Sequence, residues 1–111
     1  DKKALEPELL NVEELCSYTE HILLLSGRSD RQVDAIAEGI KAALRDEGRT
    51  AMGVEGKASG QWALLDYGDL IIHIFHHPIR MHYDLESLWS EAKRVEIEVP
   101  DEARIPAGDD Y

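Results

Sequence analysis

The pattern of apolar and polar positions is clearest over residues 61–75, which read QWALLDYGDLIIHIF. Two runs of strand-forming residues, Trp62–Leu65 and Leu70–Phe75, flank a short break that contains Gly68. Glycine suits such a break because it adopts positive φ without a Cβ penalty. The pattern therefore predicts an antiparallel hairpin. Its second run is apolar at nearly every position, which indicates a central strand covered on both faces.

A helical pattern lies upstream of the hairpin, from about Ser29 to Glu47. Its apolar residues recur at helical spacing on one face: Val33, Ile36, Ala37, Ile40 and Leu44. Ser29 and Gln32 form a capping box, Asp30 places a negative charge in the first turn, and Gly48 provides a stop. We expect this helix to cover one face of a sheet.

Weaker patterns predict further strands around the hairpin. They are a short strand over Glu8–Val12, a buried strand over His21–Leu25, an edge strand over Met52–Val54 and a half-exposed strand with alternating Val95, Ile97 and Val99. The expected fold class is therefore α/β, in the mixed α+β sense. It would hold one mixed sheet of about four to five strands flanked by helices.

The C-terminal part of the chain carries the signals of a last helix and a tail. Pro78 ends the central strand because proline cannot donate to a strand ladder. Asp84 is a good N-cap for a helix with Leu85, Leu88 and Trp89 on one face. Prolines, Gly108 and acidic residues predict a flexible tail over about 100–111. We see no internal repeat, so a single domain over residues 1–111 is expected.

The charge balance of the chain bears on its partners. Twelve basic and 23 acidic residues leave a net charge of -11, with 32% of residues charged and 43% apolar. Such a surface repels phosphate backbones, which disfavours direct nucleic-acid binding through a broad basic patch. It would attract a basic protein; alternatively, the charge only keeps the domain soluble.

Cysteine content and hydropathy exclude several other classes of protein. The single Cys16 excludes an internal disulfide and a cysteine-rich zinc site, and it fits a reducing compartment. No apolar run reaches the roughly 18 residues that a transmembrane helix needs. The chain opens on Asp1 rather than an initiator Met, so we expect either processing or a missing upstream segment, such as a preceding helix.

The histidines are candidate metal ligands. Four of the five, namely His73, His76, His77 and His82, fall within residues 73–82. Strand alternation points His73 and His76 to opposite faces, and no metalloprotease motif is present. Buried or surface histidines without a metal are the favoured interpretation, and we expect neither a metal nor a cofactor.

Asp66 and Asp69 are the best candidates for paired carboxylates. They flank the expected turn and could hold magnesium or act as acid and base. Side-chain hydrogen bonds that stabilise the turn are the favoured alternative. A magnesium-dependent nucleotidyltransferase-like enzyme remains the second functional hypothesis. It requires Ser26, from the Ser26–Ser29 turn, to converge with both acids on one cleft.

Alternation along the first arm of the hairpin suggests a binding surface. Trp62, Leu64 and Asp66 share one face, and Ala63, Leu65 and Tyr67 share the other. A large aromatic, an aliphatic and an acid together are typical of a protein-binding patch. Alternatively, Trp62 packs under a helix as core, and spacing does not decide between the two. A third hypothesis is a homodimeric adaptor paired through an exposed strand edge.

An ordered set of motifs resembles a known family. Residues 26–33 (SGRSDRQV) with Ala35-Ile36-Ala37 look like the first signature of the ribosomal silencing factor family, the Iojap-like proteins. The second block of that family is similar to residues 53–56 (GVEG), 62–75, Arg80, 83–86 (YDLE) and Leu88-Trp89. The resemblance covers roughly Ser26 to Trp89. The chain departs from the family at Glu8–Val12 and Glu20–Ile22, and it lacks the usual opening helix.

The resemblance implies a fold similar to nucleotidyltransferases without their catalytic carboxylates, and no enzymatic activity. It implies a translational repressor that binds ribosomal protein fourteen of the large subunit and sterically blocks joining of the small subunit. The compartment would be the cytoplasm or an organelle interior. On this basis we expect partner contacts from the sheet face and the hairpin turn, through Trp62, Leu64, Asp66, Tyr67, Gly68, Asp69, His73 and Tyr83.

Overall fold

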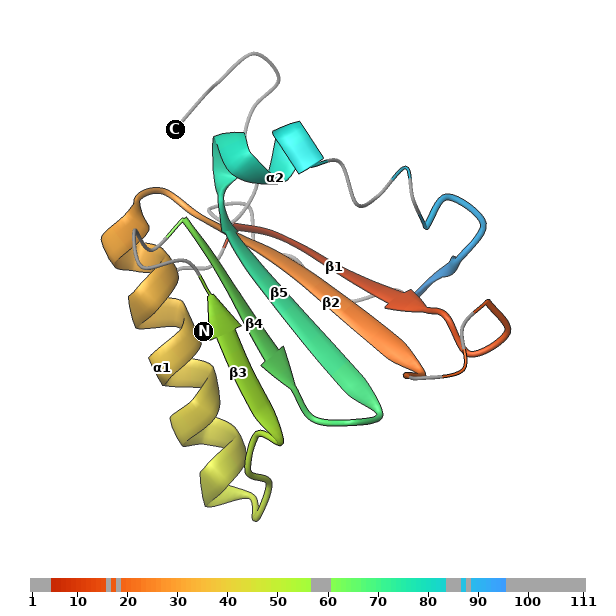
Figure 1. Cartoon of the computed structure of the whole chain (residues 1–111), viewed down its shortest axis with the longest axis horizontal. Helices are drawn as coiled ribbons and strands as arrows, with labels where there is room; N and C mark the ends of the chain where they lie inside the picture. Colours follow the sequence, from red (N-terminus) through yellow and green to blue (C-terminus); the bar gives the residue numbers. More distant parts are fainter. Residues whose placement is uncertain are drawn as a thin grey trace.

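The computed structural model describes residues 5–15, 17, 19–56, 61–83, 87 and 89–95. They form one six-stranded mixed sheet and two helices (Figure 1). The elements are β1 (Leu5–Asn11), β2 (His21–Gly27), α1 (Asp30–Asp46), β3 (Gly53–Gly56), β4 (Trp62–Asp66), β5 (Leu70–His76), α2 (His77–Tyr83) and β6 (Lys93–Val95). The strand order is β3-β4-β5-β2-β1-β6. The predicted fold class is confirmed, with more strands than the four to five expected.

The predicted hairpin is formed by β4 and β5. Its antiparallel register runs from Trp62 opposite Phe75 to Asp66 opposite Ile71. Gly68 in the turn has φ +85°, the conformation that glycine adopts most readily. On its other side β5 pairs with β2 in parallel, so the prediction of a central strand is confirmed. Coverage of both its faces is confirmed only in part, because Ile71 and His73 are half-buried.

Helix α1 begins and ends where the capping signals predicted. The Ser29 hydroxyl oxygen accepts from the Gln32 backbone N–H at 3.2 Å, and the Gln32 side chain accepts from the Arg28 N–H at 2.6 Å. Gly48 follows the helix with φ +84°. The apolar stripe of α1 packs on the sheet in a buried cluster whose members include Val33, Ile36, Ala37, Leu25, Leu65, Ile72 and Ile74. This packing covers one face of β2, β4 and β5.

Three strand boundaries differ from the expected ones. β1 begins at Leu5 and includes Pro7, with a register shift between Leu5 and Glu8 and φ +46° at Glu6. This irregularity fits the proline, which cannot donate to a ladder. β2 extends through the expected Ser-Gly turn to Gly27. β3 covers Gly53–Gly56 rather than Met52–Val54, and its predicted edge position is confirmed.

The region after β5 differs most from expectation. α2 begins directly at His77, with Pro78 in its first turn, where a missing N–H costs no helical hydrogen bond. Pro78 therefore ends the strand and also starts a helix. The predicted N-cap Asp84 and the apolar Leu85 and Leu88 lie outside the described residues. So do Ile97, Val99 and the expected tail over 100–111.

The described residues after α2 pack against a second buried cluster and add the last strand of the sheet. Trp89 lies in a turn and, with Ala92, packs against a cluster of Leu10, Val12, Ile22 and Leu24. β6 then pairs with β1, Val95 standing opposite Leu9. Within the described part of the chain, neither helix is long and apolar enough to cross a membrane.

Candidate functional site

The two faces of β4 have different environments. Ala63 and Leu65, 9% and 0% exposed, lie on the face that α1 covers. Trp62, Leu64 and Asp66 lie on the opposite face and are half-buried. The alternation predicted from the sequence is confirmed, and the indole of Trp62 is not sealed in the core.

The register of the hairpin extends this face onto β5. Leu64 stands opposite His73, and Asp66 stands opposite Ile71. Both β5 residues are half-buried. We call the surface made by Trp62, Leu64, Asp66, Ile71 and His73 the open sheet face. It combines an aromatic, two aliphatics, an acid and an imidazole on two adjacent rigid strands.

Three stacked rings stiffen one end of the open sheet face. The ring centroids of Trp62 and His73 lie 6.2 Å apart at 19°, and those of His73 and Phe75 lie 5.9 Å apart at 5°. Trp62 also stacks on Phe75 at 6.3 Å and 23°. Phe75 is 2% exposed, so it forms the buried floor of the stack. Aromatic pairs at these separations add to the stability gained by burial.

The protonation state of His73 is set by its surroundings on this surface. Its Nδ1 accepts a 3.3 Å hydrogen bond from the indole Nε1 of Trp62, which requires the neutral ring with its proton on Nε2. Burial lowers the pKa of His73 to about 4, because an apolar environment disfavours the charged form. At neutral pH the open sheet face therefore carries no positive charge at His73.

The hairpin turn places the first of the two acids. The Oδ1 of Asp66 accepts from the Gly68 N–H at 2.8 Å, and the Tyr67 N–H donates to the Leu70 carbonyl at 2.9 Å. The turn role predicted for Asp66 is confirmed. The carboxylate is still half-exposed and remains beside Leu64 and Trp62 on the open sheet face.

Asp69 has a different partner. Its carboxylate pairs with the guanidinium of Arg49, which also donates to the Tyr67 carbonyl at 3.1 Å and lies 5.6 Å from the centre of the Tyr67 ring. The hydrogen bond from Arg49 lowers the pKa of Asp69. This role of Arg49 could not be predicted from the sequence, because nothing local links Arg49 to a residue 20 positions away.

The structure does not bring all the expected contact residues to one surface. Tyr67 is 5% exposed and belongs to the core cluster under α1. Its placement as a surface contact is corrected, because alternation turns it to the same side as Leu65. Gly68 and Asp69 lie in the turn, beside but not on the open sheet face. Tyr83 ends α2, and its side chain lies outside what the structure describes.

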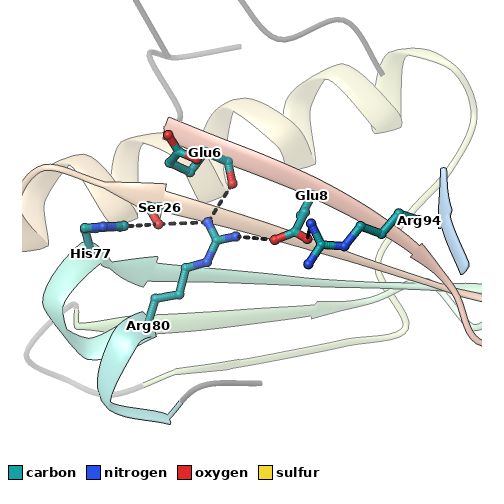
Figure 2. Close-up of polar contacts among 6 residues, drawn as sticks. All are labelled: Glu6, Glu8, Ser26, His77, Arg80 and Arg94. Carbon is teal, nitrogen blue, oxygen red and sulfur yellow. Dashed lines mark hydrogen bonds and ion pairs between the residues drawn. The ribbon is translucent and has the colours of Figure 1, made fainter. Parts of the chain in front are cut away.

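A buried polar cluster that the sequence did not reveal ties α2 to the sheet (Figure 2). Arg80 is 5% exposed and donates to the Glu6 carbonyl at 2.6 Å, to the Ser26 hydroxyl at 3.0 Å and to the Glu8 carboxylate at 3.2 Å. His77 Nδ1 lies 2.9 Å from the same Ser26 hydroxyl. Arg94 of β6 pairs with the second carboxylate oxygen of Glu8 at 2.8 Å.

These positions overturn the enzyme hypothesis built on Ser26, Asp66 and Asp69. Ser26 stands opposite Phe75, whereas Asp66 stands opposite Ile71, four residues away along β5. At the rise of a strand this places them about 13 Å apart along the strand direction, and β5 lies between their two strands. They are too far apart to share a metal ion. Ser26 is also fully buried and bonded to Arg80.

The histidines likewise do not assemble a metal site. His73 belongs to the aromatic stack and His77 to the Ser26 cluster. His76 lies 3.3 Å from the Asp30 carboxylate at the start of α1. Among the described residues, no group of three or more His, Cys, Asp or Glu side chains is placed to hold a metal ion.

Comparison with known proteins identifies close relatives of this chain. A family model described as "Ribosomal silencing factor during starvation" matches residues 1–110. Ribosomal silencing factor RsfS of Halalkalibacterium halodurans is 37% identical over 98 residues, which is 88% of this chain and 84% of that protein. The chloroplastic protein Iojap of Arabidopsis thaliana is 31% identical over 105 residues, covering 94% of this chain and 43% of that protein.

The same relationship is seen among solved structures. A crystal structure of a protein from Chromobacterium violaceum superposes with a TM-score of 0.78 and 32% sequence identity. The match covers 90% of this chain and 82% of that chain. Sequence and fold thus agree on one set of relatives.

Proposed function

Because this chain belongs to the ribosomal silencing factor family, we propose that it represses translation by binding the large ribosomal subunit through ribosomal protein fourteen. Bound there, it keeps the small subunit from joining. The family name marks a regulatory factor rather than an enzyme. Its site of action is the compartment that holds the ribosomes, a bacterial cytoplasm or an organelle interior.

The observation that carries this proposal is the half-buried aromatic stack on the open sheet face. Trp62 rests on His73 and Phe75 with its indole N–H already bonded, so its orientation is fixed before a partner arrives. A preorganised aromatic loses little side-chain entropy on docking. A tryptophan within an apolar patch is a frequent source of binding energy at protein interfaces.

Charge supports a basic partner. The chain carries a net charge of -11, and Asp66 places a half-exposed carboxylate beside Leu64 and Trp62. A ribosomal protein with exposed Lys and Arg would be steered toward this surface over a range set by ionic strength. The apolar centre then supplies affinity, and Asp66 fixes the register of a basic side chain. Asp69 and Gly68 add contacts from the turn in the proposed interface, and Tyr83 adds one from the end of α2.

The proposed block of subunit joining requires no chemical reaction. An interface of standard size covers about 800 Å² on each partner, a small part of the 6955 Å² surface of this chain. The rest of the domain, with principal extents of 35 × 31 × 27 Å, then stands on the large subunit as an obstacle. Steric exclusion of the small subunit follows from this bulk.

Sedimentation tests the proposal directly. The protein is mixed with purified large subunits and centrifuged through sucrose, with and without added small subunits. We expect it to travel with the large subunit and to reduce the amount of joined ribosome in proportion to its occupancy. Binding to joined ribosomes without loss of joining would contradict the mechanism, and absence from the large-subunit fraction would contradict the partner.

A further inference from the structure

The two edges of the sheet are protected differently. β6, at one edge, carries Lys93 and Arg94, both exposed. Charged side chains on an edge strand discourage pairing with a further chain. β3, at the other edge, reads Gly-Val-Glu-Gly; it carries one acidic residue, Glu55, and no Lys, Arg or Pro. Its backbone pairs only with β4 among the described strands. The main contacts of α1 with the sheet are to β2, β4 and β5.

Apolar side chains are exposed along this unprotected edge. Met52 is 76% exposed and Val54 is 53% exposed. Both are among the most exposed large hydrophobic residues of the described chain. An edge strand that shows exposed apolar side chains and has no second neighbour among the described strands is a template for pairing, which soluble proteins avoid unless the edge is used.

The free edge also adjoins the open sheet face. Gly53 stands opposite Asp66, and a Cβ at Gly53 would lie 3.8 Å from the Asp66 Cβ. The described glycines with positive φ are Gly48 and Gly68, so the backbone does not require glycine at position 53. Because Gly53 has no side chain, a side chain from a strand added beside β3 could reach the Asp66 carboxylate across it.

We infer that β3 receives an extended segment of the basic ribosomal partner as an added strand, an inference that rests on the proposed function. Main-chain hydrogen bonds along β3 would supply affinity, as in other cases of strand addition. Side chains of the added strand alternate between the two faces. Those beside Gly53 reach Asp66, and those on the other face meet Val54. The segment therefore alternates basic and aliphatic residues.

One substitution tests the edge without touching the open sheet face. Val54→Lys places a charge on the free edge strand, on the α1 side of the sheet, and leaves Trp62 and Asp66 in place. Its matched control is Leu15→Lys, because Leu15 is also exposed, at 43%, and follows β1 on the far side of the sheet. Binding of both variants to isolated ribosomal protein fourteen is compared by calorimetry. We expect Val54→Lys to bind roughly tenfold more weakly and the control to bind as the unmodified protein does.

Hydrogen exchange on the unmodified protein supplies the second measurement. Amides of residues 53–56 that face away from β4 should exchange rapidly in the free protein and become protected when the ribosomal protein is bound. Protection that appears at high protein concentration without the partner would instead identify a second copy of this chain as the added strand, and would overturn the inference.

The outcomes separate this inference from the proposed function. One outcome is that Trp62→Ala weakens binding, Val54→Lys does not, and β3 gains no protection from hydrogen exchange. In that case the inference of an added strand at β3 is wrong, and the proposed docking through the open sheet face stands. If Val54→Lys weakens binding without protection of β3, the edge is contacted but receives no strand, which also overturns the inference. If the unmodified protein fails to bind at all, the proposed function fails first.

Discussion

The indole Nε1 of Trp62 donates a hydrogen bond of 3.3 Å to Nδ1 of His73, across the β4–β5 pair. The two residues are not directly opposite, since Trp62 faces Phe75 and Leu64 faces His73. The bond therefore runs diagonally on the open sheet face and fixes both rings against Phe75. It links the titration of one side chain to the geometry of the other.

The first prediction concerns the dependence of stability on pH. Burial lowers the pKa of His73 from its ordinary value of 6.5 to about 4. The unfolded chain therefore takes up a proton at His73 as the pH falls below about 6.5, while the folded chain does not. Folding stability should be lost between about pH 6.5 and pH 4, by on the order of 3 kcal/mol. Above pH 7 this residue contributes no pH dependence.

Urea unfolding of His73→Gln at pH 7.5, 5.5 and 4.5 isolates this contribution, because the other histidines are retained. We expect the variant to lose less stability than the unmodified protein over this range, whatever its stability at pH 7.5. Equal losses for both proteins would show that His73 titrates normally in the fold.

The second prediction concerns Trp62 as the binding anchor. Trp62→Ala should cost at least about 2 kcal/mol of binding to ribosomal protein fourteen, or about thirtyfold in Kd. The side chain is half-buried rather than sealed in the core, so the fold should survive, which circular dichroism would verify. Leu15→Ala is the control, a truncation of an exposed apolar side chain far from β4. Undiminished capture of the partner by Trp62→Ala would remove Trp62 from the interface.

The third prediction separates the two roles of Asp66. Its Oδ1 accepts from the Gly68 N–H, and its charge faces the proposed partner. Asp66→Asn retains an acceptor for the turn and removes only the charge. We expect unchanged thermal stability, a lower association rate, and a weaker dependence of that rate on salt.

Asp66→Ala serves as the comparison for the Asn variant, since it removes the acceptor and the charge together. It should bind as weakly as Asp66→Asn and should also lose about 1 kcal/mol of stability, because the Gly68 N–H loses its partner. Equal association rates for Asp66→Asn and the unmodified protein at low salt would exclude a steering role for this carboxylate.

Local signals explain which parts of the fold could be predicted from sequence. The hairpin and α1 depend on neighbours in the chain: Gly68 for the turn, and Ser29 with Gln32 for the cap. Alternation placed Trp62 and Leu64 together, but it cannot say which face of a strand a helix will cover. The resemblance predicts a partner contact at Tyr67, although alternation places this residue on the face opposite Trp62. Tyr67 lies in the core under α1.

Contacts between distant positions explain what could not be predicted. Arg80 is 54 residues from Ser26 and 74 residues from Glu6 in the chain. No spacing rule connects them, because the contact exists only once β1, β2 and α2 are assembled. The early start of α2 could not be predicted either, since Pro78 is equally compatible with the end of a strand and the first turn of a helix.

The last prediction contrasts two arginines that share Glu8. Arg80 is buried and reaches one carboxylate oxygen, whereas Arg94 is 71% exposed and reaches the other. Arg80→Met should cost about 3 kcal/mol or more of folding stability, because it leaves Ser26, the Glu6 carbonyl and Glu8 without their shared donor. Arg94→Ala should cost less than about 1 kcal/mol, since an exposed ion pair is screened by water. Chemical unfolding of both variants measures the difference. If the buried arginine proved no more costly to remove than the exposed one, the cluster would not be what holds α2 to β1 and β2.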